Sequence, residues 1–213
     1  MSARLHTYWN DFAINLGAST EKIETIWDWI ESAYSEPHRH YHTLDHIDWC
    51  LHEFDWCRRG FSKESSDVVE FAIWFHDIVY DTMASDNKEQ SAKLARNALG
   101  VLGVGDQLFR AKLTRLINCT KHIVSEISIV EEEDVLLDID LSILGSDPEV
   151  FDQYEKNIRK EYEWVPYEMY CAGRVEILQS FLVRPKIFRS PMFQFVEEQA
   201  RENIARSVKI CST

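Results

Sequence analysis

The stretch HRHYHTLDHID at residues 38–48 gathers four histidines, one arginine and two aspartates within eleven positions. His42 and His46 are four residues apart, so in a helix they would project from the same face, one turn from each other. Two imidazoles in that relation can share a metal ion, or one can bind the metal while the other serves the substrate. The alternative is a pair of solvated histidines at the start of a helix. The stretch by itself leaves both interpretations open.

A His–Asp dipeptide lies in a second informative stretch, FAIWFHDIVYD at residues 71–81, where His76 and Asp77 end a run of apolar residues. Polar groups at the end of a buried run need partners, because burying them without hydrogen bonds costs free energy. The partner can be a metal ion. It can equally be the other member of the dipeptide, as a satisfied His–Asp pair of the core.

Two further apolar segments are interrupted by ionisable side chains. VLLDIDLSILG at residues 135–145 contains Asp138 and Asp140, and LINCTKHIV at residues 116–124 contains His122. A buried carboxylate without a partner is strongly unfavourable, so each aspartate requires a cation or a strong hydrogen-bond donor.

The overall charge excludes some classes of partner. The chain has 23 Lys and Arg against 36 Asp and Glu, a formal net charge of −13, and no basic run. Binding to duplex nucleic acid or to an anionic membrane is therefore not expected. The N-terminus lacks the layout of a signal peptide and no apolar run is long enough to span a membrane, so a soluble, cytoplasmic protein is expected. The five cysteines form no CxxC pair and are interpreted as buried, reduced thiols.

The pattern of apolar residues predicts an all-α fold. Seven Gly and five Pro leave few turns, alternation with period two is scarce, and apolar residues recur at spacings of three and four. We expect one domain over residues 1–213, a single-domain helical bundle with a core over about 20–145 and C-terminal helices over about 147–208.

Nine helices are expected. Ser66 and Asp67 are predicted to cap the fourth of them, and the acidic run EEED at residues 131–134 is interpreted as a solvated turn, because consecutive carboxylates cannot all face one ion. The expected helices cover about residues 5–16, 20–34, 43–58, 65–78, 86–100, 105–120, 147–163, 166–183 and 191–208.

Separate helices can bring their polar residues to one interior point, which is how helical bundles build metal sites in their cores. The chain offers a histidine, a His–Asp pair, another histidine and a late aspartate, each in an apolar setting. This nitrogen and oxygen donor set suits a divalent ion such as Mn²⁺, Co²⁺, Ni²⁺, Fe²⁺, Zn²⁺ or Mg²⁺ more than a thiolate-preferring metal.

The order of His46, His76, Asp77 and Asp140 resembles the signature of the HD-domain superfamily of metal-dependent phosphohydrolases. More closely, the segments YHTLDH, WFHDIVYD, DNKEQSA and DIDLSILG are similar to a group of bacterial and fungal proteins described as predicted HD-superfamily phosphohydrolases, over roughly residues 5–206. The resemblance implies an HD-type helical fold and a metal held by these four residues.

The resemblance also implies individual roles. YHTLDH is similar to the YHNxxH element of the cyclic-nucleotide phosphodiesterases, in which the earlier histidine protonates the leaving oxygen, so His42 is the candidate acid. In the same enzymes Leu-Ser follows the closing aspartate, which favours Asp140 over Asp138. HDIVYDT resembles the HDxxEDT of the alarmone hydrolases, but Tyr80 replaces their catalytic Glu, so the resemblance does not imply that specific activity.

The expected function is a metal-dependent phosphohydrolase that acts on a small phosphorylated substrate, a nucleotide or a phosphomonoester. Glu89 is a candidate to orient the attacking water, with a capping role as the alternative. Arg159 and Arg174 are candidates to bind substrate phosphate, because the guanidinium is a planar, bidentate donor.

Two alternatives stay open from the sequence. One is a non-catalytic helical protein that binds a metal or a nucleotide. The other is a di-iron oxygenase on the same scaffold, for which His122 would be the ligand that completes a second metal position. If His122 is instead a core histidine, the site holds one metal.

Overall fold

The computed structural model describes residues 2–121 and 130–212, and within these ranges every regular element is a helix. The all-α fold class is confirmed. None of the described helices is both long enough and apolar enough to cross a membrane. The elements are, in chain order, α1 (Ser2–Asn15), α2 (Thr20–Tyr34), α3 (Leu44–Cys57), η1 (Arg58–Gly60), α4 (Lys63–Phe75), α5 (Asn87–Leu102), α6 (Gln107–Cys119), α7 (Glu131–Leu141), η2 (Ser142–Gly145), α8 (Pro148–Glu161), α9 (Tyr167–Leu182), η3 (Pro191–Val196) and α10 (Glu197–Cys211).

The chain divides into two compact units, Met1–Leu136 and Leu137–Thr213, and the division falls within α7. The organisation as a single domain stays a prediction.

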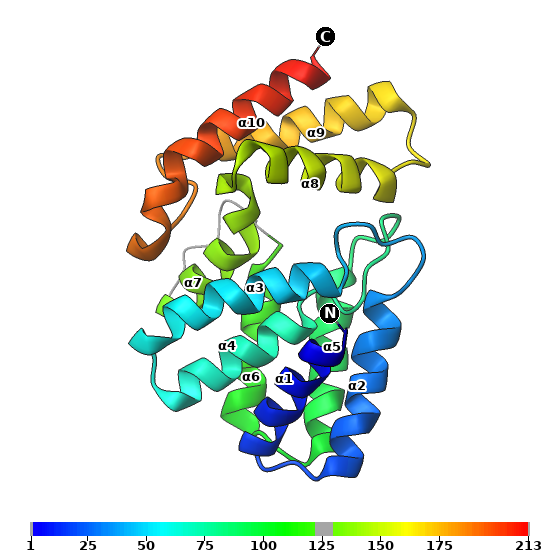
Figure 1. Ribbon diagram of the computed structural model, residues 1–213, viewed down its shortest axis with the longest axis vertical. Coiled ribbons are helices and arrows are strands. Elements are labelled where there is room, and N and C mark those ends of the chain that lie inside the picture. Colours follow the sequence, from blue (N-terminus) through cyan, green and yellow to red (C-terminus); the bar gives the residue numbers. More distant parts are fainter. Residues whose placement is uncertain (1, 122–129, 213) are drawn as a thin grey trace. The chain divides into compact units, whose positions relative to one another are not determined.

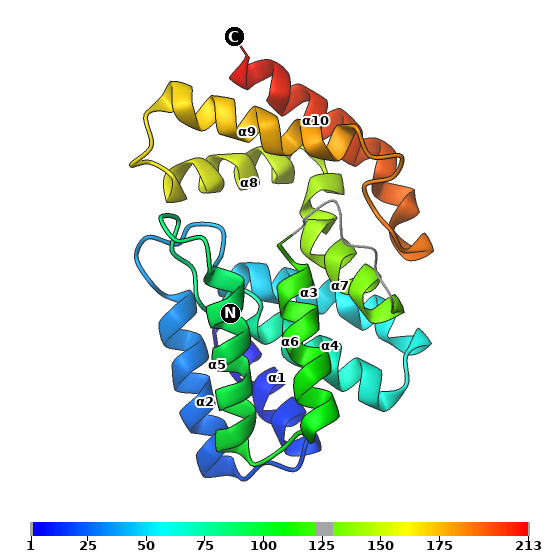
Figure 2. The same cartoon turned by 180° about the vertical axis from the view of Figure 1, so that it is seen from behind.

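The first unit is built around α4, whose residues from Val68 to Phe75 are all buried. Apart from Glu70 this segment is apolar, and a helix that is apolar on nearly every side must be covered on every side. Helices α3, α5 and α6 contact it, and α5 and α6 lie side by side (Figures 1 and 2). Trp9 of α1 packs edge-on against Phe71 and Trp74 of α4. The core of this unit is therefore aromatic, and it holds α4 in a fixed position.

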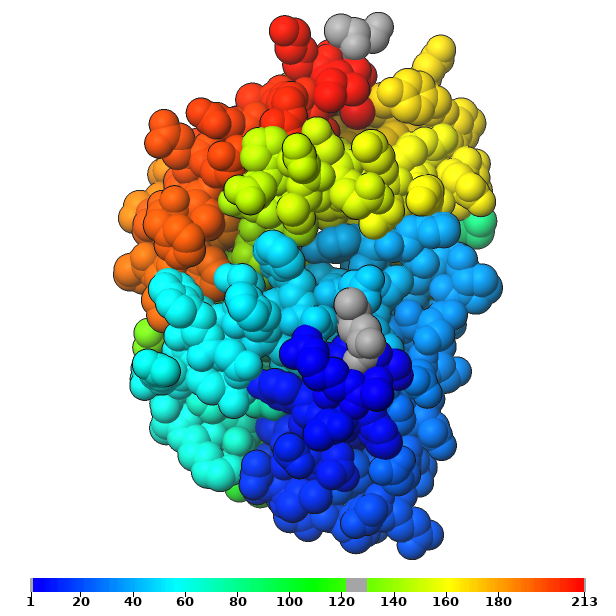
Figure 3. Space-filling view, viewed as in Figure 1, coloured from blue at the N-terminus to red at the C-terminus, as the bar shows by residue number. Residues whose placement is uncertain are grey.

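Helices α1 and α2 of the first unit are amphipathic, with one buried face and one exposed face. In α2 the buried residues Ile23, Ile26, Trp27 and Ile30 recur at helical spacing. Helix α1 packs against α2, and Figure 3 shows its dark-blue surface beside that of α2.

The second unit contains α8, α9 and α10, with α10 packed against both other helices and against η2. Buried Asn203 of α10 donates from Nδ2 to the carbonyl oxygens of Leu144 and Ser146, at 2.9 and 2.8 Å. The backbone of Gly145 approaches η3 so closely that an added Cβ would lie 2.6 Å from the Cβ of Val196. Only glycine fits this contact between the two 3-10 helices.

Helix α7 corrects one expectation. The run EEED at residues 131–134 is the first turn of α7 and not a solvated turn. Acidic side chains favour the first turn of a helix, where the unpaired backbone N–H groups carry partial positive charge. One of them, Glu133, is buried and forms an ion pair with Arg115 of α6.

Candidate metal centre

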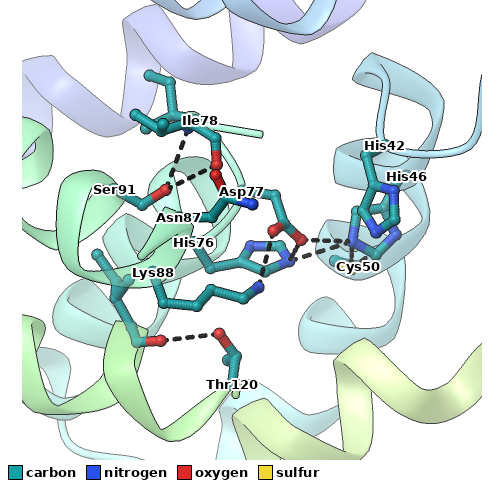
Figure 4. A network of polar contacts seen from close by, with 12 residues as sticks. His42, His46, Cys50, His76, Asp77, Ile78, Asn87, Lys88, Ser91 and Thr120 are labelled. Atoms are coloured by element: carbon teal, nitrogen blue, oxygen red, sulfur yellow. Dashed lines mark hydrogen bonds and ion pairs between the residues drawn. The ribbon is translucent and has the colours of Figure 1, made fainter. Parts of the chain in front are cut away.

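Helix ends of the first unit bring its candidate ligands together. His46 lies in the first turn of α3, which begins after Thr43, whose side chain accepts from Asp45 N. His76 is the C-terminal cap of α4, and Asp77 follows it directly. Figure 4 shows that these side chains point toward one another, with Lys88 from the first turn of α5 beside them.

The three ligand atoms surround one point. The Nε2 atoms of His46 and His76 are 3.1 Å apart, and Oδ2 of Asp77 lies 3.0 Å from the Nε2 of His76 and 3.9 Å from that of His46. All three residues are buried, and one ligand atom of each lies within 4.8 Å of the others. The structure thus brings His46, His76 and Asp77 together in a buried cluster that could hold a metal ion, and their role as ligands stays a prediction.

A hydrogen bond to the backbone fixes which nitrogen of the His76 ring donates. Its Nδ1 lies 2.9 Å from the carbonyl oxygen of Ile73, and because a carbonyl only accepts, Nδ1 must donate. The other nitrogen of the neutral ring, Nε2, then carries a lone pair toward the centre. A metal-binding histidine is commonly oriented in this way by a partner of its second nitrogen.

Asp77 provides the strongest indication of an ion. Its side chain is 3–4% exposed, Oδ1 accepts from Nζ of Lys88 at 2.7 Å, and Oδ2 makes no hydrogen bond. Burial by itself raises the pKa of Asp77, but the nearby positive charge of Lys88 is the largest of the effects that outweigh it and hold the pKa well below its usual range. An ionised, buried oxygen without a donor is costly unless a cation faces it. Two imidazole nitrogens and this oxygen therefore fit a divalent cation.

Cys50 lies beside the same imidazoles and was not among the residues predicted from the sequence. It follows His46 by one helical turn on α3, and its Sγ is 3.8 Å from both ring nitrogens of His46. His46, Cys50 and His76 form a second group whose ligand atoms lie within 4.8 Å of one another. The signal in the sequence was the i, i+4 spacing to His46.

His42 does not share the helix of His46, which corrects the expected geometry. It precedes Thr43, the N-cap of α3, and its ring stacks on Tyr80 with the centroids 4.1 Å apart and the planes at 27°. The rings of His42 and His46 still lie close, with centroids 5.7 Å apart. A loop and not a helix face therefore brings His42 near the centre.

Arg39 fixes that loop against the turn after α4. Its buried guanidinium donates to the carbonyl oxygens of Asp77 at 2.6 Å and Ile78 at 2.9 Å, and to that of His42 at 3.3 Å. Buried carbonyl groups need such donors. One side chain thus holds the candidate acid and the candidate ligand in a constant relation.

The sequence also predicted Glu89, Arg159 and Arg174 as residues of the site. Glu89 is exposed in the first turn of α5 and forms an ion pair with Lys121. In the second unit, Arg159 donates to the carbonyl oxygen of Val165 at 3.1 Å, and buried Arg174 donates to the hydroxyl of Tyr154 at 2.8 Å. Their roles toward water and substrate stay predictions.

Asp140, the predicted closing ligand, lies half-buried on the part of α7 that belongs to the second unit. Its role as a ligand also stays a prediction. His122 lies outside the described residues, so the expectation of a second metal position does too.

Comparison of the chain with family models, with curated proteins and with solved structures gives no match. The all-helical fold and the buried His/Asp cluster are compatible with an HD-type fold.

Proposed function

We propose that this protein is a metal-dependent phosphohydrolase that acts on a small phosphorylated substrate, a nucleotide or a phosphomonoester. The observation that carries the proposal is Oδ2 of Asp77, which is buried without a hydrogen bond and lies next to the facing Nε2 atoms of His46 and His76. Asp140 is the proposed fourth ligand, from its place in the order of residues that resembles the HD signature.

Different residues have different proposed roles in the reaction. His46, His76 and Asp77 would hold the cation, and Lys88 keeps Oδ1 of Asp77 occupied so that Oδ2 faces the imidazoles. When bound, a divalent cation supplies positive charge that polarises a phosphoryl oxygen and makes water more acidic. This charge also counters the repulsion between an anionic substrate and a chain of net charge −13.

His42 is the proposed acid that protonates the leaving oxygen. Its ring is held in place by Tyr80 on one side and lies near His46 on the other. A positioned acid must be close to the reacting bond without being consumed as a ligand. Tyr80 therefore has a role here as the platform for His42. Glu89 is proposed to orient water, and Arg159 and Arg174 to bind phosphate.

The test combines metal analysis with a substrate screen. Protein purified without added metal is analysed for bound elements, and phosphate release is then measured over nucleotides and phosphomonoesters with Mn²⁺, Co²⁺, Ni²⁺ and Mg²⁺. We expect bound metal and release from at least one substrate class. His76→Ala should abolish both. His52→Ala, an exposed histidine of α3, is the matched control and should leave both unchanged.

Either of two results contradicts the proposal. Undiminished phosphate release by His76→Ala would place the reaction elsewhere. A metal-loaded protein that releases phosphate from no compound of the screen would be the non-catalytic binding protein of the alternative.

A further inference from the structure

The imidazoles of His46 and His76 belong to two ligand groups. One group is completed by the carboxylate of Asp77, and the other by the thiol of Cys50. Both third ligands are buried, with Cys50 only 1% exposed, and Figure 4 shows Cys50 beside His46. The two groups differ in chemical character, because carboxylate oxygen favours hard cations and thiolate sulfur favours soft ones.

We infer that His46, Cys50 and His76 form an alternative site for a thiophilic divalent cation such as Zn²⁺, with Cys50 as a thiolate ligand. In tetrahedral zinc sites, bonds of about 2.0–2.1 Å to nitrogen and about 2.3 Å to sulfur place two nitrogens about 3.3 Å apart and a nitrogen and a sulfur about 3.6 Å apart. The distances in the protein are 3.1 Å between the two Nε2 atoms and 3.8 Å between Sγ and the nitrogens of His46. The ligand atoms of Cys50 and His76 lie within 4.8 Å of each other, so movement of these side chains can bring the three atoms to bonding distance of one ion.

The position of Cys50 on α3 allows its sulfur to act as a metal ligand. It lies one turn after His46 on the same helix, so the backbone fixes the separation of the two side chains. Rotation about a single bond, χ1, moves its sulfur. On binding, the S–H bond breaks, the proton passes to solvent and the sulfur donates an electron pair to the cation, so no oxidant or reductant is required.

The consequence is a choice between metals. An ion bound by Cys50 uses the same two imidazoles as the ion of the proposed phosphohydrolase, so the two cannot be bound together. Zn²⁺ should therefore inhibit a reaction supported by Mn²⁺ or Mg²⁺, and Cys50→Ser should relieve that inhibition. The inhibition rests on the proposed function, whereas the thiolate ligation does not.

Cobalt provides the test, because Co²⁺ reports its ligands by absorption. We expect wild-type protein titrated with Co²⁺ to develop a near-ultraviolet charge-transfer band from sulfur to cobalt, and Zn²⁺ to abolish it by displacement. Cys50→Ser and Cys50→Ala should lack the band while their circular dichroism stays helical. Cys57→Ser, which removes another buried thiol of α3, should keep it. In chelator competition, Cys50→Ser should weaken Zn²⁺ binding by more than about 10-fold, since even loss of a partner of a ligand has that effect.

Two outcomes overturn the inference in different ways. Co²⁺ that binds, as seen in calorimetry, without the charge-transfer band excludes Cys50 as a ligand and leaves the proposed metal centre intact. A band that persists in both Cys50 variants has the same meaning. Absence of any Co²⁺ and Zn²⁺ binding contradicts the metal centre itself.

Discussion

Asp77 and Asp138 are both buried carboxylates in apolar stretches of sequence, at 3% and 0% exposure, yet their surroundings differ. In the second unit, the two oxygens of Asp138 accept from the backbone N–H groups of Arg189 and Ser190, at 2.8 and 2.6 Å. In the first unit, Oδ1 of Asp77 accepts from Lys88, and Oδ2 has no hydrogen bond.

The difference separates a carboxylate whose two oxygens accept from the backbone from one that keeps an oxygen available for a cation. Each buried carboxylate needed a strong donor or a cation, and only the folded chain tells which of the two it receives. Two backbone N–H groups stabilise the ionised form of Asp138 and tie α7 to the segment before η3. Asp77 keeps one oxygen turned toward two imidazoles, which is the arrangement of a ligand. The following predictions test this contrast.

The largest effect is expected for Asp77→Ala. Removing the carboxylate takes away the proposed ligand and its ion pair with Lys88, so metal affinity should fall by more than about 100-fold, beyond the loss typical of a partner of a ligand. Phosphate release should disappear with it. Elemental analysis after dialysis measures the metal content. Full metal occupancy in the variant would remove Asp77 from the centre.

His42→Ala should separate binding from turnover within the first unit. Because His42 stacks on Tyr80 outside the His46, His76 and Asp77 group, the variant should keep its metal. Turnover should fall by about 10²- to 10⁴-fold, the range for loss of a general acid. The loss should be smallest for an activated aryl phosphate, whose leaving group needs no proton. Equal loss of metal in this variant and in Asp77→Ala would make His42 a ligand.

Asp138→Ala should affect stability and not metal chemistry. Two hydrogen bonds to a charged acceptor are lost and two backbone N–H groups are left without it, so the free energy of unfolding should fall by about 3–5 kcal/mol. Urea denaturation followed by circular dichroism measures the change, and the metal content of folded protein should match wild type. Glu163→Ala, an exposed carboxylate of the same unit, should shift stability by less than about 0.5 kcal/mol. A similar small shift for Asp138→Ala would contradict the structural role.

Glu70 is a buried carboxylate of a third kind, because its pKa is raised. Its effect on stability should be the smallest of those predicted here. Burial raises its pKa to about 7 from the usual 4.5, although Arg58 beside it acts in the opposite direction. The folded state therefore holds a proton that the unfolded state releases above pH 4.5. This contribution to stability is fully present below pH 4.5 and is lost as the pH rises through about 7.

Glu70→Gln removes that titration. The free energy of unfolding of wild type relative to the variant should decline by on the order of 1 kcal/mol for each pH unit between the two pKa values. Thermal or urea unfolding from pH 4.5 to 8 checks the slope. A difference between the two proteins that stays constant over this range would show that Glu70 titrates normally.

The helices were predictable because their apolar residues follow the helical period closely. All nine expected helices have counterparts, and α2 matches its expected range, residues 20–34. The predicted ends of the helices were less accurate than the helices themselves. Helix α4 begins after Ser62, whose side chain accepts from Ser65 N, and not at the predicted caps Ser66 and Asp67. Helix α7 was missed, since its acidic first turn resembles a solvated turn when Arg115, the partner of Glu133, is unknown.

The sequence predicted a cluster of histidine and aspartate side chains, but it identified only some of the residues in and around that cluster. His76 and Asp77 were identified because polar residues at the end of an apolar run are unusual. His46 was identified by its spacing of four from His42 and by the order of residues that resembles the HD signature. Lys88 was missed although its neighbour Glu89 was chosen, because successive helical residues point about 100° apart and the sequence does not say which one faces Asp77. Arg39 was missed for another reason. Its contacts with Asp77 and Ile78 join positions almost forty residues apart, and no local pattern encodes them.

The burial of α4 from Val68 to Phe75 makes this segment intolerant of inserted or deleted residues. His76 stands at the end of this helix, and its direction is set by the count of residues from Val68, where the buried segment begins. One inserted or deleted residue would turn His76 by about 100° and move it by about 1.5 Å along the axis, while the aromatic core prevents the helix from sliding to compensate. A substitution along α4 leaves the direction of His76 unchanged, whereas an insertion or a deletion does not. A library of single-codon insertions between Val68 and His76 should therefore yield no metal-binding clones.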